Sequence, residues 1–323
     1  MNPPSRQPVD LSRLKTWSIG QRAHQVAVEG LAGLPPRGAS FGDWWAALPH
    51  FLGATQLRAA VEAILAARRA ERPVVMALGA HVVKVGCSPI VVDLLRRGLI
   101  TDVALNGATA IHDVELALFG ETSEEVSDTL RDGRFGMVRE TAEFFAEALA
   151  LPDVVTKTGL GAALGDLLRR RGAPHAAHSI LAAAHEHGAA ATVHVALGTD
   201  TIHVHPNVDA GRLGAASGLD FRIACAVVCR MAAPRGKPGG VWCNVGSAVV
   251  LPEVFLKAVA VARNLGHDLD GLRAVNLDMT RQYRPGQNVI GRPVAAGCGH
   301  EIIGHHELLL PLLRQALIEQ SAP

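Results

Sequence analysis

The segment Ala77–Gly120 constrains the fold more than any other part of the chain, because it twice repeats the order of strand, polar loop and helix. The runs Val74–Leu78 and Asp102–Leu105 are short and apolar, which is typical of buried parallel strands. Pro89 suits the first turn of the helix after the first loop, and we expect Ser88 to cap that helix. This order predicts βαβ units and a parallel sheet.

Three further apolar runs fit the same sheet, at Ala191–Ala196, Val241–Val245 and Ala274–Leu277. Helical periodicity separates the strands, and the last helix is expected to begin near His305. The order predicts an α/β fold, a Rossmann-like doubly wound parallel sheet of about six strands with helices on both faces.

The predicted domain plan has three parts. Residues 1–54 are rich in Pro and Gly and are expected to form an N-terminal arm that packs on the body or on a neighbouring subunit. Residues 55–323 are expected to form a single domain. Within it, residues 121–172 show helical patterns and no strand, which predicts a helical insertion.

Composition narrows the class of protein. The chain has 323 residues, 49% of them hydrophobic, and a formal net charge of +1, with no basic patch that would favour nucleic acid. No apolar run predicts a membrane span or a secretory leader. The cysteines are scattered and form no C-x-x-C pair, which favours a reduced, cytoplasmic protein; they are Cys87, Cys225, Cys229, Cys243 and Cys298.

Small and polar residues gather where the predicted strands end. In an open parallel sheet this carboxyl edge is where ligands bind, so we expect a cofactor there. The candidate cofactor-binding residues are Gly79, His81, Lys84, Gly86, Ser88, Asn106, Gly107, Ala108, Asp200, Asn244, Gly246 and Ser247. The alternatives are a plain turn with an acidic helix start after Asn106, which would suit the helix dipole, and a solvated loop lysine at Lys84. The chain has no G-x-G-x-x-G dinucleotide motif.

Histidines and carboxylates near these loops are candidates for acid–base catalysis. They are His112, Asp113, Glu115, His205, His305 and His306. Helix capping and ordinary surface histidines are the alternatives. A metal site is a separate possibility, because His203 and His205 would point the same way on an extended segment and Asp209 follows them.

Several segments resemble the deoxyhypusine-synthase-like superfamily of NAD-binding proteins, including a bacterial group described only by that likeness. The residues GAHVVKVGCSPIVVDLLRRGLITDVALNGATAIHDVE are similar to its Ser/Asn loop, helix, strand and Gly-rich acidic turn. The later GGVWCNVGSAVVLPEVFLKAVAVARN and ELLLPLL resemble its Gly-Gly strand-loop-helix and its closing helix. The segment NGATAIHDVELALFG is similar to a motif of the NAD-dependent ornithine cyclodeaminase domain, which implies that Asn106, His112, Asp113 and Glu115 contact cofactor or substrate.

One departure from the family limits the activity that the resemblance implies. Deoxyhypusine synthase forms an imine through a lysine in a Trp-Gly-Lys context, whereas here the last lysine is Lys257 and Trp242 is followed by Cys243. Deoxyhypusine synthesis itself is therefore not expected. The resemblance still implies NAD binding, oxidation of a C–N bond of a small amine or amino acid to an imine, and a homo-oligomer, either dimer or tetramer. The alternatives are a metal-dependent hydrolase or lyase that uses His203, His205 and Asp209, and a non-catalytic NAD- or nucleotide-binding protein.

Overall fold

The computed structural model describes residues 8–321 and contains a six-stranded sheet in which every neighbouring pair is parallel. The strand order is β3-β2-β1-β4-β5-β6, the order of a Rossmann sheet. Its strands are β1 (Val74–Leu78), β2 (Asp102–Asn106), β3 (Ala191–His194), β4 (Val241–Val245), β5 (Arg273–Asp278) and β6 (Gly299–Ile303). The predicted fold class is confirmed.

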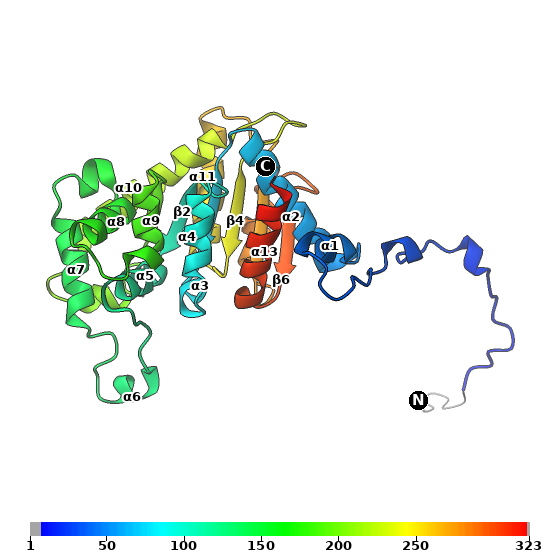
Figure 1. Ribbon diagram of the computed structural model, residues 1–323, viewed down its shortest axis with the longest axis horizontal. Helices are drawn as coiled ribbons and strands as arrows, with labels where there is room; N and C mark the ends of the chain where they lie inside the picture. Colours follow the sequence, from blue (N-terminus) through cyan, green and yellow to red (C-terminus); the bar gives the residue numbers. More distant parts are fainter. Residues whose placement is uncertain (1–7, 322–323) are drawn as a thin grey trace, which may run out of the picture.

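Helices cover both faces of this sheet (Figure 1). The α-helices are α1 (Phe41–Ala47), α2 (Leu52–Arg69), α3 (His81–Lys84), α4 (Ser88–Arg96), α5 (Gly107–Phe119), α6 (Val126–Arg131), α7 (Arg139–Ala150), α8 (Leu160–Arg170), α9 (Ile180–Glu186), α10 (Ala210–Arg230), α11 (Val250–Asn264), α12 (Tyr283–Asn288) and α13 (His306–Gln320). Short helices of other types are η1 (Ile19–Gln21), η2 (Val28–Gly30), η3 (Val154–Thr158), η4 (Ala176–His178) and η5 (Thr201–Val204). Within residues 8–321, none of the helices combines the length and apolar character that crossing a membrane needs.

Strand alternation divides the core in two. Val74, Met76 and Leu78 of β1 point into the core beneath α2, α4 and α13, whereas Val75 and Ala77 point into the core beneath α10 and α11. On the second face the rings of Trp242 and Phe255 stack with centroids 4.7 Å apart. Both faces are therefore apolar, as expected for a parallel sheet covered on both sides.

Two regions lie outside the three-layer body, which consists of the sheet and the helices on its two faces. Residues 121–172 contain α6, α7, η3 and α8, and they pack beside the β3 edge of the sheet with α5, α9 and α10 (Figure 1). At the other end, the chain before α1 leads away from the body (Figure 1). Trp45 anchors α1 in the core, and the Arg58 guanidinium donates hydrogen bonds to the carbonyls of Trp45, Leu48 and Pro49. Trp44, next to Trp45 on α1, is exposed, and Phe51, before α2, is partly buried.

Three local expectations were wrong. Gly299–Ile303, which was not among the predicted strands, is the sixth strand, because it pairs with β5. The segment of His203 is a short helix, η5, so His203 and His205 do not alternate along a strand. Ser88 is the first residue of α4 rather than its cap, and its buried hydroxyl has no hydrogen-bond partner among the described residues.

Candidate functional site

The centre of the carboxyl edge lies between β1 and β4, where the strand order reverses and open α/β sheets bind ligands. Here the Gly79 amide donates to the Val245 carbonyl at 2.8 Å. A Cβ atom on Gly79 would overlap the Gly246 carbonyl, and one on Gly246, whose φ is +65°, would lie 2.7 Å from His306 Nε2. Only glycine fits at these two positions. Because neither carries a side chain, the backbones at the ends of β1 and β4 and the His306 imidazole lie in close contact.

Polar groups without partners surround these glycines. His306 is fully buried, and both of its ring nitrogens lack a hydrogen-bond partner in the part of the chain that the structure describes. Its ring lies 6.0 Å from that of His81, centroid to centroid. Burial lowers the pKa of His306, although Asp278 acts in the opposite direction, so the imidazole is neutral at pH 7.

A buried pair of asparagines lies on the other face of the sheet at the same edge. The Asn244 side-chain amide donates to Asn276 Oδ1 at 2.8 Å and to the Ser247 carbonyl at 3.0 Å. Asn244 Oδ1 and Asn276 Nδ2 have no partner among the described residues. Because leaving buried polar atoms unpaired is costly, the glycine cradle and these atoms together fit a polar cofactor such as NAD⁺.

The second loop, at the end of β2, starts α5. Asn106 caps this helix, since its Oδ1 accepts from the Thr109 amide at 2.9 Å and from the Thr109 hydroxyl at 2.6 Å. Asp200, from the loop after β3, lies so close to Gly107 that a Cβ atom there would overlap its carboxylate. Burial raises the pKa of Asp200, with His203 acting against the rise. Asn106 is therefore the N-cap of α5, and the first turn of this helix carries no acidic residue, unlike the acidic helix start that the sequence offered as an alternative.

A cavity of about 530 Å³ opens beside this loop, large enough for a small metabolite. The residues that line it come from α3, α5, the segment after α5, the start of α7 and the loop after β3 with the start of η5. The polar ones are Lys84, His112, Glu115, Glu121, Thr122, Ser123, Glu124, Thr141, Thr199, Asp200 and Thr201. Of the predicted site residues, Lys84, Ala108, His112, Glu115 and Asp200 meet here. Residues 121–124 were not predicted, because only the folded chain brings them back over α5.

A hydrogen-bonded chain on one wall fixes the proton on His112. The Thr122 hydroxyl donates to Glu115 Oε2 at 2.5 Å and lies 2.6 Å from His112 Nδ1. Since this hydroxyl has a single proton, it accepts from His112 Nδ1–H, which leaves the lone pair on Nε2. Sequence could have indicated the His112–Glu115 pair, because residues three apart share a helix face.

The charges on the cavity favour a cationic ligand. Burial alone would raise the pKa of Glu115, but the nearby His112 ring and hydrogen bonds from the Thr122 and Thr141 hydroxyls outweigh it and hold the pKa below its ordinary value. Glu115 is therefore a carboxylate at neutral pH. Acidic side chains outnumber the single lysine on the lining, where they are Glu115, Glu121, Glu124 and Asp200.

The structure assigns Asp113 a structural position, away from the cavity. Its carboxylate accepts from the Ser179 hydroxyl at 2.6 Å and from the Ile180 and Leu181 amides at 2.8 and 3.1 Å, at the start of α9. Burial raises its pKa to about 6, against the effect of these bonds. With both oxygens occupied, Asp113 does not serve as the expected base, and this candidate is corrected.

The remaining candidates lie apart from the cavity lining. His205 Nε2 lies 3.3 Å from the Gly136 carbonyl, and His305 is exposed beside Glu307. Gly86 has a φ of +77° in the turn before α4, where a Cβ atom would meet open space. Asp209 caps α10, and within residues 8–321 no group of three or more His, Cys, Asp or Glu side chains is arranged to hold a metal ion. The His203 site predicted from sequence therefore has no geometric support.

Comparisons with known proteins identify solved structures that share this fold. Neither a protein-family model nor a curated protein sequence matches the chain. Unliganded AgrE matches with 13% identity and a TM-score of 0.54 over 83% of this chain and 34% of that chain. A conserved LOR/SDH-like protein from Methanococcus maripaludis S2 matches with 12% identity and a TM-score of 0.51 over 84% of this chain and 70% of that chain.

A deoxyhypusine synthase candidate from Entamoeba histolytica matches with 11% identity and a TM-score of 0.51, over 88% of this chain and 95% of that chain. This chain spans about a third of the length of the AgrE structure. At such identities the likeness concerns the fold. The chain therefore shares the α/β fold of these three solved structures.

Proposed function

We propose that this protein is an NAD-dependent enzyme that oxidises a C–N bond of a small cationic amine or amino acid to an imine. The observation that carries the proposal is the acidic cavity at the carboxyl ends of β2 and β3 in a Rossmann sheet, with a histidine base on its wall. AgrE, whose unliganded structure shares the fold, has been crystallised with ornithine and NAD⁺, which suggests the first ligands to test.

Different residues of the cavity would bind the substrate and accept a proton from it. Glu115 is held as a carboxylate and, with Asp200, binds the substrate ammonium. Lys84 supplies the one positive side chain of the lining, suited to a substrate carboxylate. His112 Nε2 accepts a proton from the substrate nitrogen, and the Thr122 hydroxyl holds the ring in the required tautomer.

The glycine cradle at Gly79 and Gly246, with Asn244, Ser247 and the buried His306, would hold the cofactor. When bound, NAD⁺ supplies the two-electron oxidant. The neutral His306 imidazole has two free ring positions for hydrogen bonds to a ribose or amide group. These residues lie at the place where doubly wound sheets bind dinucleotides, although the glycine motif of standard Rossmann proteins is absent.

The test is NADH formation, followed by absorbance, with NAD⁺ and a panel of L-ornithine, L-lysine, L-arginine and putrescine. We expect His112→Gln to lower kcat by about 100-fold or more, since general-base catalysis contributes at least that much. We expect Glu115→Gln to raise KM about tenfold or more by removing the ammonium partner. Exposed His187→Gln and Glu143→Gln are matched controls that should change neither constant.

Two outcomes would count against the proposal. Binding of NAD⁺ in calorimetry with no amine-dependent NADH would favour the non-catalytic nucleotide-binding alternative. Failure of the protein to bind NAD⁺ at all would remove the cofactor from the proposal and with it the oxidation.

A further inference from the structure

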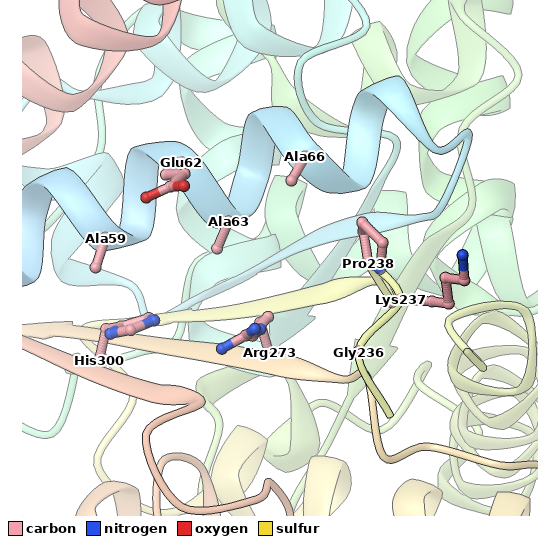
Figure 2. Close-up of a pocket in the computed structure, with 10 residues that line it drawn as sticks. Ala59, Glu62, Ala63, Ala66, Gly236, Lys237, Pro238, Arg273 and His300 are labelled. Atoms are coloured by element: carbon pink, nitrogen blue, oxygen red, sulfur yellow. The ribbon is translucent and has the colours of Figure 1, made fainter. Parts of the chain in front are cut away.

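A second cavity lies at the opposite end of the strands, beneath α2, and the proposed reaction does not use it. It is about 270 Å³ in volume and is bounded by α2, the loop before β4, and strands β5 and β6 (Figure 2). Arg273 is the first residue of β5, so this cavity belongs to the amino ends of the strands, whereas the cofactor cradle is at the carboxyl ends.

Strand alternation explains why polar side chains enter this cavity. In the parallel register Arg273 pairs with Val241, and Val275 pairs with His300. Val241 and Val275 belong to the core beneath α2, so Arg273 and His300 project from the sheet toward the same side.

Small residues on α2 leave the space open. Ala59, Ala63 and Ala66 recur at helical spacing and line the cavity from above (Figure 2). Larger apolar residues at these positions would fill the gap between the helix and the sheet, as elsewhere in this core. The space is too small for a dinucleotide and suits a small metabolite.

His300 is the polar group aimed into this space. Its side chain is 9% exposed, and no hydrogen bond to its ring is found among residues 8–321. Burial lowers its pKa, and nearby Arg273 adds to this effect while Glu62 opposes it. The ring is therefore neutral and can either donate or accept a hydrogen bond to a ligand.

Charges of both signs face the cavity without pairing with each other. Glu62 stands on α2, while Lys237 and Arg273 stand on the loop and strand side. In residues 8–321, the ion pairs closer than 4.0 Å include none of the three. Among residues 8–321, the Arg273 guanidinium donates one hydrogen bond, a long one of 3.5 Å to the Gly297 carbonyl. The Glu62 carboxylate on α2 and the Arg273 guanidinium on β5 are the pair of opposite charges that complements a zwitterion.

We propose that this cavity is a second binding site, specific for a free α-amino acid, with Arg273 holding its carboxylate and Glu62 its ammonium. His300 provides a further hydrogen bond at the floor of the site. The site is separate from the catalytic cavity, so an amino acid bound here is an effector rather than a substrate. The proposal does not depend on the redox function.

Calorimetric titration of the full-length protein with each of the common L-amino acids is the test. We expect at least one to bind, and Ala63→Leu, which fills the cavity, to weaken that binding about tenfold or more. Arg273→Gln should do the same, and Arg69→Gln, an exposed arginine near the end of α2, should not. Propionate, which lacks the ammonium, should bind the wild type much more weakly than the amino acid does. Because Glu62 would not contact propionate, Glu62→Gln should not weaken propionate binding further.

The outcomes separate this site from the catalytic one. If amino-acid binding survives unchanged in Ala63→Leu and Arg273→Gln, the ligand sits elsewhere and the proposal fails. If propionate or inorganic phosphate binds as well as the amino acid, the cavity is a simple anion site and the zwitterion assignment is wrong. Binding lost in Ala63→Leu with amine-dependent NADH formation intact would support this site, and a protein without any redox activity could still give that binding result.

Discussion

At the residue scale, residues within one turn of α5 have different surroundings: some line the cavity, and Asp113 contacts a neighbouring helix. His112 and Glu115 share the face that lines the cavity, whereas Asp113 is turned about 100° away from His112 and reaches the start of α9. A carboxylate there satisfies amides that would otherwise be unpaired at a helix N-terminus. Its role is to position α9.

Replacement of Asp113 tests that role. In Asp113→Asn one side-chain oxygen becomes an NH₂ group that faces a donor, either the Ile180 amide or the Ser179 hydroxyl and Leu181 amide. We expect the free energy of unfolding at pH 7 to fall by about 1–3 kcal/mol in urea denaturation. Under conditions where the variant is folded, kcat should stay near that of the wild type. A large loss of kcat with unchanged stability would restore Asp113 as a catalytic residue.

Asp220 predicts a pH dependence of stability. Burial raises its pKa to about 7, against hydrogen bonds from the Val193 and Gly161 amides and from Leu160. In the unfolded chain its pKa returns to the ordinary value near 3.8. Between these values the folded state keeps a proton that the unfolded state releases, so the contribution of Asp220 is complete below about pH 4 and falls as pH rises to about 7.

Asp220→Asn keeps the shape and stays neutral at every pH. Relative to the wild type, the variant should therefore gain stability as pH rises from about 4 to about 7, by at most about 4 kcal/mol. Urea denaturation of both proteins at a series of pH values measures this difference. A difference that stays constant with pH would mean that Asp220 titrates at its ordinary pKa in the folded protein.

At the scale of elements, the contact between the ends of β1 and β4 is the tightest part of the candidate cofactor site. Gly79→Ala places a methyl group against the Gly246 carbonyl, which is backbone and has no rotamer to move. We expect the two strand ends to separate, with a loss of unfolding free energy of about 2 kcal/mol or more and weaker NAD⁺ binding.

Gly218→Ala is the matched control for that substitution. Gly218 lies inside α10, where a Cβ atom would meet nothing within 4 Å. Because Ala favours helices more than Gly, this variant should be more stable by about 0.5–1 kcal/mol. Thermal unfolding and calorimetry of both variants compare the two sites. If both variants had the same stability and the same NAD⁺ affinity, the close approach of Gly79 to Gly246 would not contribute to either quantity.

Much of the sheet could be predicted, because five strands are apolar runs that are buried on both faces. The sixth, Gly299–Ile303, could not, since it has His300 and Glu301 at its centre and becomes a strand only by pairing with β5. The site residues differ in the same way: some were predictable from the local sequence, and others were not. Lys84, His112 and Asp200 were found because they follow strand ends, whereas Thr122 and its neighbours reach the cavity only through the path of residues 121–138.

At the scale of the whole molecule, the arm before α1 is the feature that a single copy leaves unexplained. Between residues 8 and 40 it exposes nine large apolar side chains, each more than half exposed; they are Val9, Leu11, Leu14, Trp17, Ile19, Val26, Val28, Leu31 and Leu34. The arm leads away from the body instead of covering it (Figure 1). Apolar surface of this extent is typical of a protein–protein interface, so we propose that the arm packs on a second copy of the chain.

This proposal predicts a change of oligomeric state. Replacing Leu14, Trp17 and Leu31 together by Ser removes apolar contact area worth roughly 1.5–3 kcal/mol per buried side chain, which is enough to weaken a dimer or tetramer by several powers of ten. Sedimentation equilibrium at micromolar concentration should show an oligomer for the wild type and a smaller species for the variant. Replacing the exposed arm residues Arg13, Lys15 and Arg37 by Ser instead should leave the oligomer intact, because charged side chains at an interface rim contribute little. A wild-type protein that sediments as a monomer would refute the pairing of copies through the arm, since the apolar side chains would then have no second chain to cover them.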